Sequence, residues 1–144
     1  MKKIFLICLL LFSSTILAES RDQFQIKINN AMSADCRLKD PIILFGHVSD
    51  HTSIPIVIHP NQTATFLMRS GPRYGSQIYK DKSFLLTYVC DYEQEITLFA
   101  NAGRSVDSKR LDVKNMWATF KSNRPINSNT PILGRSEIEW TLTY

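Results

Sequence analysis

Apolar residues recur at every second position in short runs along this chain, and no other sequence feature constrains its fold as strongly. Residues 24–28 and 138–144 show the pattern most clearly, with polar residues between the apolar ones. Because successive side chains of a strand point to opposite faces of a sheet, such a run can bury one face and expose the other. No comparable stretch has apolar residues at helical spacing. The chain is therefore expected to be built from strands.

Six further segments are expected to be strands: 42–45, 54–58, 63–68, 83–90, 94–100 and 116–121. Gly, Pro, Asn and Ser residues separate most of these segments and favour turns there. Seven or eight short strands joined by turns predict an all-β protein, an antiparallel β-sandwich.

Two parts of this pattern carry more specific expectations. Pro60-Asn61 separates the runs 54–58 and 63–68, which favours a hairpin between them. Residues 104–115 are polar, and their apolar side chains are too widely spaced to predict more than one short helix.

The N-terminus has the three parts of a secretory signal peptide. Met1-Lys2-Lys3 is basic, residues 4–12 are apolar, and residues 13–18 are smaller and more polar, so cleavage is expected after Ala18. The apolar run is shorter than the roughly 20 residues that span a bilayer. The alternative is an uncleaved anchor. We expect residues 1–18 to be a signal peptide and residues 19–144 to form a single domain, exported to the periplasm or outside the cell.

Removal of that peptide would take Cys8 with it and leave two cysteines, Cys36 and Cys90. Two cysteines in an oxidising compartment predict one disulfide. The alternative is a reactive thiol, but Cys90 ends an apolar run, where the charged thiolate is disfavoured.

Charge and motifs exclude several classes of function. The chain has 17 Lys and Arg against 13 Asp and Glu; without Lys2 and Lys3 the balance is 15 minus 13, or +2. The basic residues are scattered among acidic ones, so no nucleic-acid partner is expected. Neither a Gly-x-Ser-x-Gly motif nor a phosphate-binding glycine pattern is present. No cofactor, metal or catalytic residue is predicted.

Two groups of polar residues remain open to a chemical reading. His47, His51 and His59 lie close enough in sequence to converge on a metal, although no helix aligns them, and loop histidines are the simpler reading. Glu93 with Glu95, and Glu137 with Glu139, have the spacing of one strand face. Such pairs could serve as the acid and base of a glycosidase or could simply be solvated.

Aromatic and basic residues interleave in the segment between residues 69 and 82. Turn-forming residues break the strand pattern there, and Arg73, Tyr74, Tyr79 and Lys80 are our candidate ligand-binding residues. Tyr92 and Trp117 are further candidates. Tyrosine and tryptophan rings combine an apolar face with a polar tip, which suits a membrane interface or a sugar. Ordinary packing is the alternative.

Three segments carry a resemblance to known proteins: Ile26–Asn30, Ile56–Phe66 and the run from Tyr79 onward. Their order of strands and turns resembles that of secreted aegerolysin-like and actinoporin-like β-sandwich proteins, over about half of the mature chain. The resemblance implies a domain that binds membrane lipid headgroups. No lipid-contacting residue is carried over, because a glycine after Pro60 and a dense Trp/Tyr cluster are missing.

A second resemblance is to pilin-like subunits, which also tend to carry one disulfide, as Cys36 with Cys90 would be, and an aromatic residue near the C-terminus, as Tyr144 is. It implies an incomplete sandwich that accepts a strand from a neighbour. No long alternating donor segment precedes Phe24, which disfavours this reading.

Together these observations predict an exported, non-enzymatic binding domain whose partner is a lipid membrane or a glycan surface. The alternative is a structural or adhesive subunit assembled by strand exchange. A small secreted hydrolase ranks third.

Overall fold

A computed structural model describes residues 23–70, 82–102, 106–112, 117–122 and 136–144. The expected signal peptide, residues 1–18, lies outside the described residues. So do the four candidate ligand-binding residues, Arg73, Tyr74, Tyr79 and Lys80. No described helix is long and apolar enough to cross a bilayer.

The described strands are β1 (Gln23–Asn30), β2 (Cys36–Phe45), β3 (His47–Val48), β4 (Val57–Ile58), β5 (Thr63–Arg69), β6 (Lys82–Val89), β7 (Glu95–Ala102), β8 (Val106–Asp112), β9 (Trp117–Ser122) and β10 (Ser136–Thr143). A single 3-10 turn, η1 (Asp91–Glu93), lies between β6 and β7. The described residues are thus almost entirely β, as the alternation predicted.

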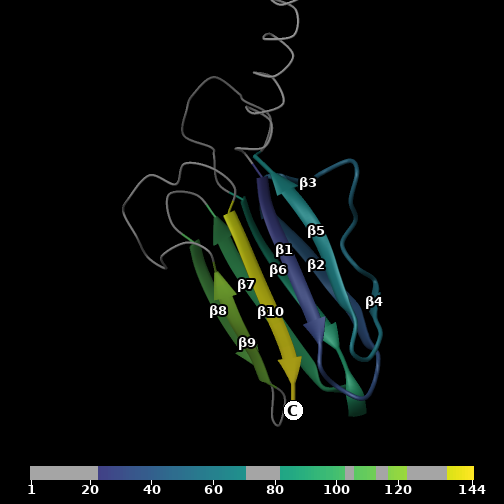
Figure 1. Cartoon of the computed structure of the whole chain (residues 1–144). Helices are drawn as coiled ribbons and strands as arrows, with labels where there is room; N and C mark the ends of the chain where they lie inside the picture. The colour runs from purple at the N-terminus through teal and green to yellow at the C-terminus, as the bar shows by residue number, and fades with distance from the viewer. Residues whose placement is uncertain (1–22, 71–81, 103–105, 113–116, 123–135) are drawn as a thin grey trace, which may run out of the picture.

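These strands form two five-stranded sheets. Sheet A has the order β3-β5-β1-β10-β9, and sheet B has the order β4-β2-β6-β7-β8. Neighbours pair antiparallel, except that β1 and β10 run parallel in the middle of sheet A. Figure 1 shows the sheets packed face to face, with β1 and β10 in front of β6 and β7. The predicted β-sandwich with one disulfide is confirmed.

The core fills the space between the sheets. Every second residue of β6, β7 and β10 is buried, because one face of each strand points at the opposite sheet. The Phe84 ring of sheet B lies between two rings of sheet A, with its centroid 6.3 Å from that of Phe24 and 5.9 Å from that of Phe66. All three side chains are fully buried. These ring contacts stabilise the packing of the two sheets against each other.

The two ends of the sandwich differ. The strand register brings Asn30, Cys36 and Cys90 to one end, called here the disulfide pole. The opposite end, called the corner pole, holds Phe45, Gly46, Arg69 and Lys82, since Phe45 pairs near the start of β6 and His47 pairs with Arg69. In Figure 1 the C-terminus marks the disulfide pole and β3 marks the corner pole.

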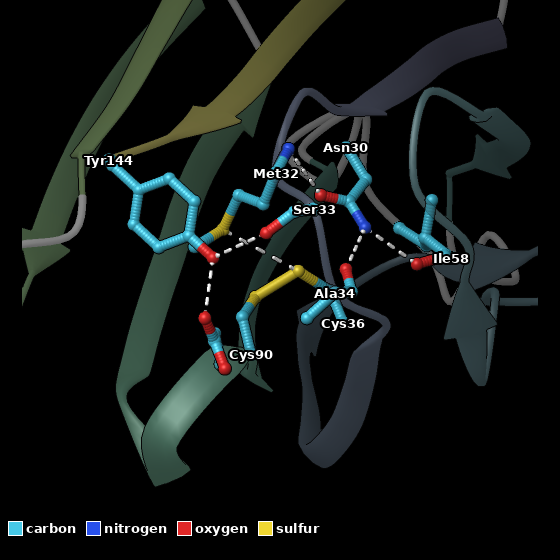
Figure 2. The surroundings of a disulfide bond; sticks show 9 residues. Asn30, Met32, Ser33, Ala34, Cys36, Ile58, Cys90 and Tyr144 are labelled. Atoms are coloured by element: carbon cyan, nitrogen blue, oxygen red, sulfur yellow. Dashed lines mark hydrogen bonds between the residues drawn. A yellow bond between two sulfur atoms is a disulfide. The ribbon is translucent and has the colours of Figure 1, made fainter.

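At the disulfide pole, Cys36 is bonded to Cys90 across 54 residues of sequence. Beside the bridge, the side-chain amide of Asn30 donates hydrogen bonds to the carbonyls of Ala34 and Ile58, both at 2.8 Å, as Figure 2 shows. This amide therefore donates to one carbonyl in the bend before β2 and to one carbonyl of β4, which keeps the backbone at this pole hydrogen-bonded.

At the corner pole, Gly46 turns the chain from sheet B into sheet A. Its φ is +79°, a conformation that favours glycine, and a Cβ atom there would lie 2.4 Å from the carbonyl oxygen of Arg69. The turn therefore depends on the absence of a side chain. After it, the chain pairs with β5 instead of returning along β2.

Two expectations from the sequence were wrong. The segments 54–58 and 63–68 form no hairpin: β4 covers only Val57–Ile58 and pairs with β2 in sheet B, whereas β5 pairs with β1 and β3 in sheet A. Residues 106–112 form a strand, β8, in a stretch where only a short helix was considered. Its weak pattern is overridden by backbone pairing with the exposed edge of β7.

The disulfide should contribute a large part of the stability. Closing a loop of this length lowers the entropy of the unfolded chain, by about 4 kcal/mol on the loop-entropy relation. We expect the double variant Cys36→Ser/Cys90→Ser to lose roughly 2–4 kcal/mol in urea unfolding. An unchanged midpoint in this variant, or in the reduced protein, would show that the bridge contributes nothing.

The substitution Gly46→Ala should destabilise the fold by about 2 kcal/mol or more, because alanine pays a penalty for positive φ and its Cβ would collide with a backbone oxygen. Urea unfolding would measure the change. The neighbouring substitution His47→Ala, at an exposed side chain, is the control and should change stability by less than about 0.5 kcal/mol. Equal stabilities for the two variants would contradict this account of the corner.

Candidate functional site

The three histidines do not form a metal site. His47 is in β3 and His51 lies in the turn after it, while the ring of His59 is hydrogen-bonded at 2.8 Å to Asp35 near the disulfide pole. Among the described residues, no group of three His, Cys, Asp or Glu side chains is arranged to hold a metal ion.

The two glutamate pairs also differ from what a glycosidase needs. Glu93 lies in η1 with a φ of +59°, so it does not share a strand face with Glu95, whose carboxylate is bonded to Lys39. Glu137 and Glu139 do share the outer face of sheet A. Each has an ion pair there, Glu137 with Lys27 at 2.9 Å.

Glu139 shows why that face does not provide a general acid. Its carboxylate accepts a hydrogen bond of 2.7 Å from Asn29 and lies 3.0 Å from the ammonium of Lys121. These two interactions, the Asn29 bond first, hold the pKa of Glu139 below its usual range. A general acid needs the opposite shift.

A shallow hollow lies beside this carboxylate. It is lined by Thr119, Phe120, Lys121, Glu139 and Thr141 and has a volume of about 130 Å³. Sites for small-molecule ligands usually enclose roughly 300–1,000 Å³. The hollow is thus too small to hold a substrate away from water.

Tyr88 is the buried ionisable side chain at the core. Burial raises its pKa, and its hydroxyl donates a 2.9 Å hydrogen bond to the carbonyl of Pro55. The phenol therefore stays neutral and holds the segment around Pro55, between β3 and β4, against sheet B. This role is structural.

The feature that stands out is a run of apolar side chains exposed on β2. Four consecutive residues are exposed: Ile42 by 43%, Ile43 by 36%, Leu44 by 44% and Phe45 by 50%. We call this run the β2 apolar surface. At about 200 Å² for a large apolar side chain, it presents roughly 350 Å² to water. That area lies in the range of the largest apolar patch on a typical monomer, about 300–600 Å², which is often functional.

The exposure has a topological cause. β6 flanks the full length of β2 on one side, but on the other side β4 pairs only with Cys36 and Arg37, and Leu38 adds one backbone hydrogen bond to Ile56. Among the described strands, none covers that side of β2 from Lys39 to Phe45.

The β2 apolar surface reaches both faces of the strand. Ile43 lies opposite Phe84, whose side chain is in the core, whereas Ile42 lies opposite Leu85 on the outer face. Leu85 in turn pairs with Phe99 of β7, which is half-buried on the same outer face. The apolar side chains therefore form a row that crosses sheet B from its edge.

Three features make this edge a poor partner for another strand. Pro41 has no N–H to donate, and register shifts after Leu38 and after Ile43 interrupt the straight ladder. Proline and bulges are devices by which sheets avoid edge-to-edge pairing. The edge thus offers apolar side chains without offering regular backbone hydrogen bonds.

The β2 apolar surface can bind an apolar partner through the hydrophobic effect. Complete transfer of its roughly 350 Å² out of water would be worth at most about 9 kcal/mol at about 25 cal/mol per Å². Nothing in its side chains can donate a proton or act as a nucleophile, so binding is the chemistry that the arrangement supports.

Sequence reasoning assigned residues 42–45 to a strand but missed their exposure. The available signal was the break in alternation: four apolar residues in a row cannot all face one core. The candidate ligand-binding residues of the segment 71–81 stay a prediction. That segment joins Ser70 to Lys82, and the ends of β5 and β6 at these positions lie at the corner pole, as Phe45 does.

Comparison with known proteins finds no matching protein family and no matching curated protein. Solved structures do match. The lipid binding protein Nakanori has a TM-score of 0.65 at 11% identity, over 91% of this chain and 76% of Nakanori. IP-1A from Alcaligenes faecalis has a TM-score of 0.54 at 11% identity, over 87% and 94% of the two chains. The RahU protein, solved with a TRIS molecule, has 0.53 at 10% identity, over 84% and 93%. At such identities the likeness is one of fold, and this fold includes a lipid-binding protein.

Proposed function

We propose that this chain is an exported, non-enzymatic binding domain that attaches to a lipid surface. The observation that carries the proposal is the β2 apolar surface, a contiguous run of exposed side chains from Ile42 to Phe45. The disulfide is in keeping with an oxidising compartment, where an exported protein would work. The fold shared with a lipid-binding protein gives independent support.

Lipid suits this surface better than glycan does. A sugar is bound by hydrogen bonds to its hydroxyls and by stacking on aromatic rings, whereas three of the four exposed side chains are aliphatic. Polar groups of the kind a sugar needs do gather on the outer face of sheet A. There, however, Asn29 already bonds Thr63, Glu139 and Thr141.

Assembly by strand exchange is the second candidate, and the uncovered side of β2 favours it. Pro41 and the two register shifts weigh against it, because an added strand needs a regular ladder. The chain also supplies its own central strand in sheet A, since β1 pairs on both sides.

Sedimentation with vesicles tests the proposal. The mature domain, residues 19–144, is mixed with phosphatidylcholine vesicles, with vesicles that also contain phosphatidylglycerol, and with no vesicles. We expect the protein to pellet with vesicles only. The double variant Ile42→Ser/Leu44→Ser should lower the partition coefficient roughly tenfold, because it removes apolar transfer energy from two exposed side chains.

Ile56→Ser is the matched control. Ile56 is 72% exposed but lies outside the β2 apolar surface, so this variant should partition as the unsubstituted protein does. An equal loss for both variants, or no binding to any vesicle, would refute lipid attachment through this surface. Pelleting without vesicles would instead favour strand exchange.

A further inference from the structure

We propose that the domain binds end-on: the corner pole faces the lipid, Leu44 and Phe45 enter the interfacial layer, and the disulfide pole stays in water. This inference rests on the proposed function and specifies how the same surface is used. It assigns an orientation and a depth, neither of which follows from lipid binding alone.

Exposure along β2 supports the end-on orientation. The exposed fraction is 43% at Ile42, 36% at Ile43, 44% at Leu44 and 50% at Phe45, the last residue of the strand. The most accessible part of the β2 apolar surface is therefore its end at the corner pole. Gly46 follows directly, with a φ of +79°, and turns the chain from β2 toward β3.

Several charged and hydrogen-bonded groups lie at the opposite pole, where η1, which holds Tyr92, and the start of β9, which holds Trp117, also lie. Tyr144, an exposed aromatic residue there, bonds through its hydroxyl to Asp91 at 2.7 Å and, as Figure 2 shows, to Ser33 at 3.2 Å. Asp35, nearby in the chain, bonds both Arg37 and His59. Moving these charged groups into lipid would cost far more than the Tyr144 ring would gain.

The depth of insertion is limited by backbone and charge. The uncovered side of β2 exposes backbone groups that water can satisfy and hydrocarbon cannot. Asp40 lies five residues before Phe45, or about 16 Å along a strand at 3.3 Å per residue, and Lys39 precedes it. An upright β2 can thus bury its last side chains while Lys39 and Asp40 remain outside, and the charged groups of Arg69 and Lys82, at the corner pole itself, must then stay at the level of the headgroups.

A second copy of this chain fits the β2 apolar surface less well. A stable protein interface buries about 800 Å² on each partner, more than twice the roughly 350 Å² available here. Edge-to-edge pairing of two β2 strands would also meet Pro41 and two register shifts on each side. A lipid surface needs neither the larger area nor a regular ladder.

Quenching of a single added tryptophan by lipid tests the orientation. Phe45→Trp places the probe at the corner pole, and Tyr144→Trp places a matched probe, with 47% exposure at the native side chain against 50%, at the disulfide pole. Both are mixed with vesicles of phosphatidylcholine and phosphatidylglycerol brominated on the acyl chains. Unsubstituted protein supplies the background of Trp117 and Trp140, and thermal unfolding confirms that each variant folds.

We expect a blue-shifted emission and at least a twofold loss of the added signal for Phe45→Trp, with less than a tenth lost for Tyr144→Trp. If both variants sediment with the vesicles but Tyr144→Trp is quenched and Phe45→Trp is not, the orientation is wrong and the proposed function stands. Equal quenching of the two probes would also overturn the end-on inference.

If neither variant nor the unsubstituted protein sediments with the vesicles, the proposed function is wrong, and the end-on inference, which rests on it, is wrong too. A concentration-dependent dimer without quenching would show that the β2 apolar surface binds a second copy of this chain instead of lipid.

Discussion

The parallel pairing of β1 with β10 is the constraint on which the rest of the structure depends. It joins the first and last described strands, in register from Phe24 with Ser136 to Asn30 with Leu142. Parallel neighbours cannot be joined by a tight turn, so the chain must build everything else between these two strands. That intervening structure comprises sheet B together with β3, β5 and β9 of sheet A, and the Phe84 ring of sheet B packs against both β1 and β5. The pairing of β1 with β10 therefore also fixes the strands of sheet A against which the core of sheet B packs.

This closure leaves the two poles with different chemistry. At the disulfide pole, a covalent bond and the side-chain amide of Asn30 hold the turns. At the corner pole, the chain leaves sheet B at Gly46 and pairs with β5. Because β3 belongs to sheet A, no described strand flanks β2 on that side beyond its short pairing with β4, and the apolar end of β2 is exposed. The candidate binding surface is thus a direct consequence of how the chain crosses between sheets.

An exposed apolar edge is a hazard for any β protein, because it invites pairing with another chain. Here Pro41 and two register shifts disrupt the ladder while the side chains beyond them stay apolar. That combination discourages a protein partner and still favours contact with an apolar medium. The same physical features connect the stability of the monomer with the proposed attachment to lipid.

The sequence by itself determined those elements whose pattern is local and strong. Residues 24–28 and 138–144 alternate cleanly and became β1 and β10, and Cys36 and Cys90 had one pairing available once Cys8 was assigned to the signal peptide. Strand partners were not determined, because hydrogen bonds between distant strands leave no mark in a local pattern. For this reason the expected hairpin between residues 54–58 and 63–68 was wrong. For the same reason the sequence did not predict β8, which forms by pairing with the edge of β7.

At the candidate site, too, the sequence predicted the local structure, whereas the tertiary structure decided the exposure. Four apolar residues from Ile42 to Phe45 were enough to predict a strand, but a strand of this composition is ordinarily buried. Whether it is buried depends on which strand lies alongside it, and the turn at Gly46 sends the following segment to the other sheet. Only the tertiary structure could decide the exposure of β2, because exposure is a property of the neighbours that a residue lacks.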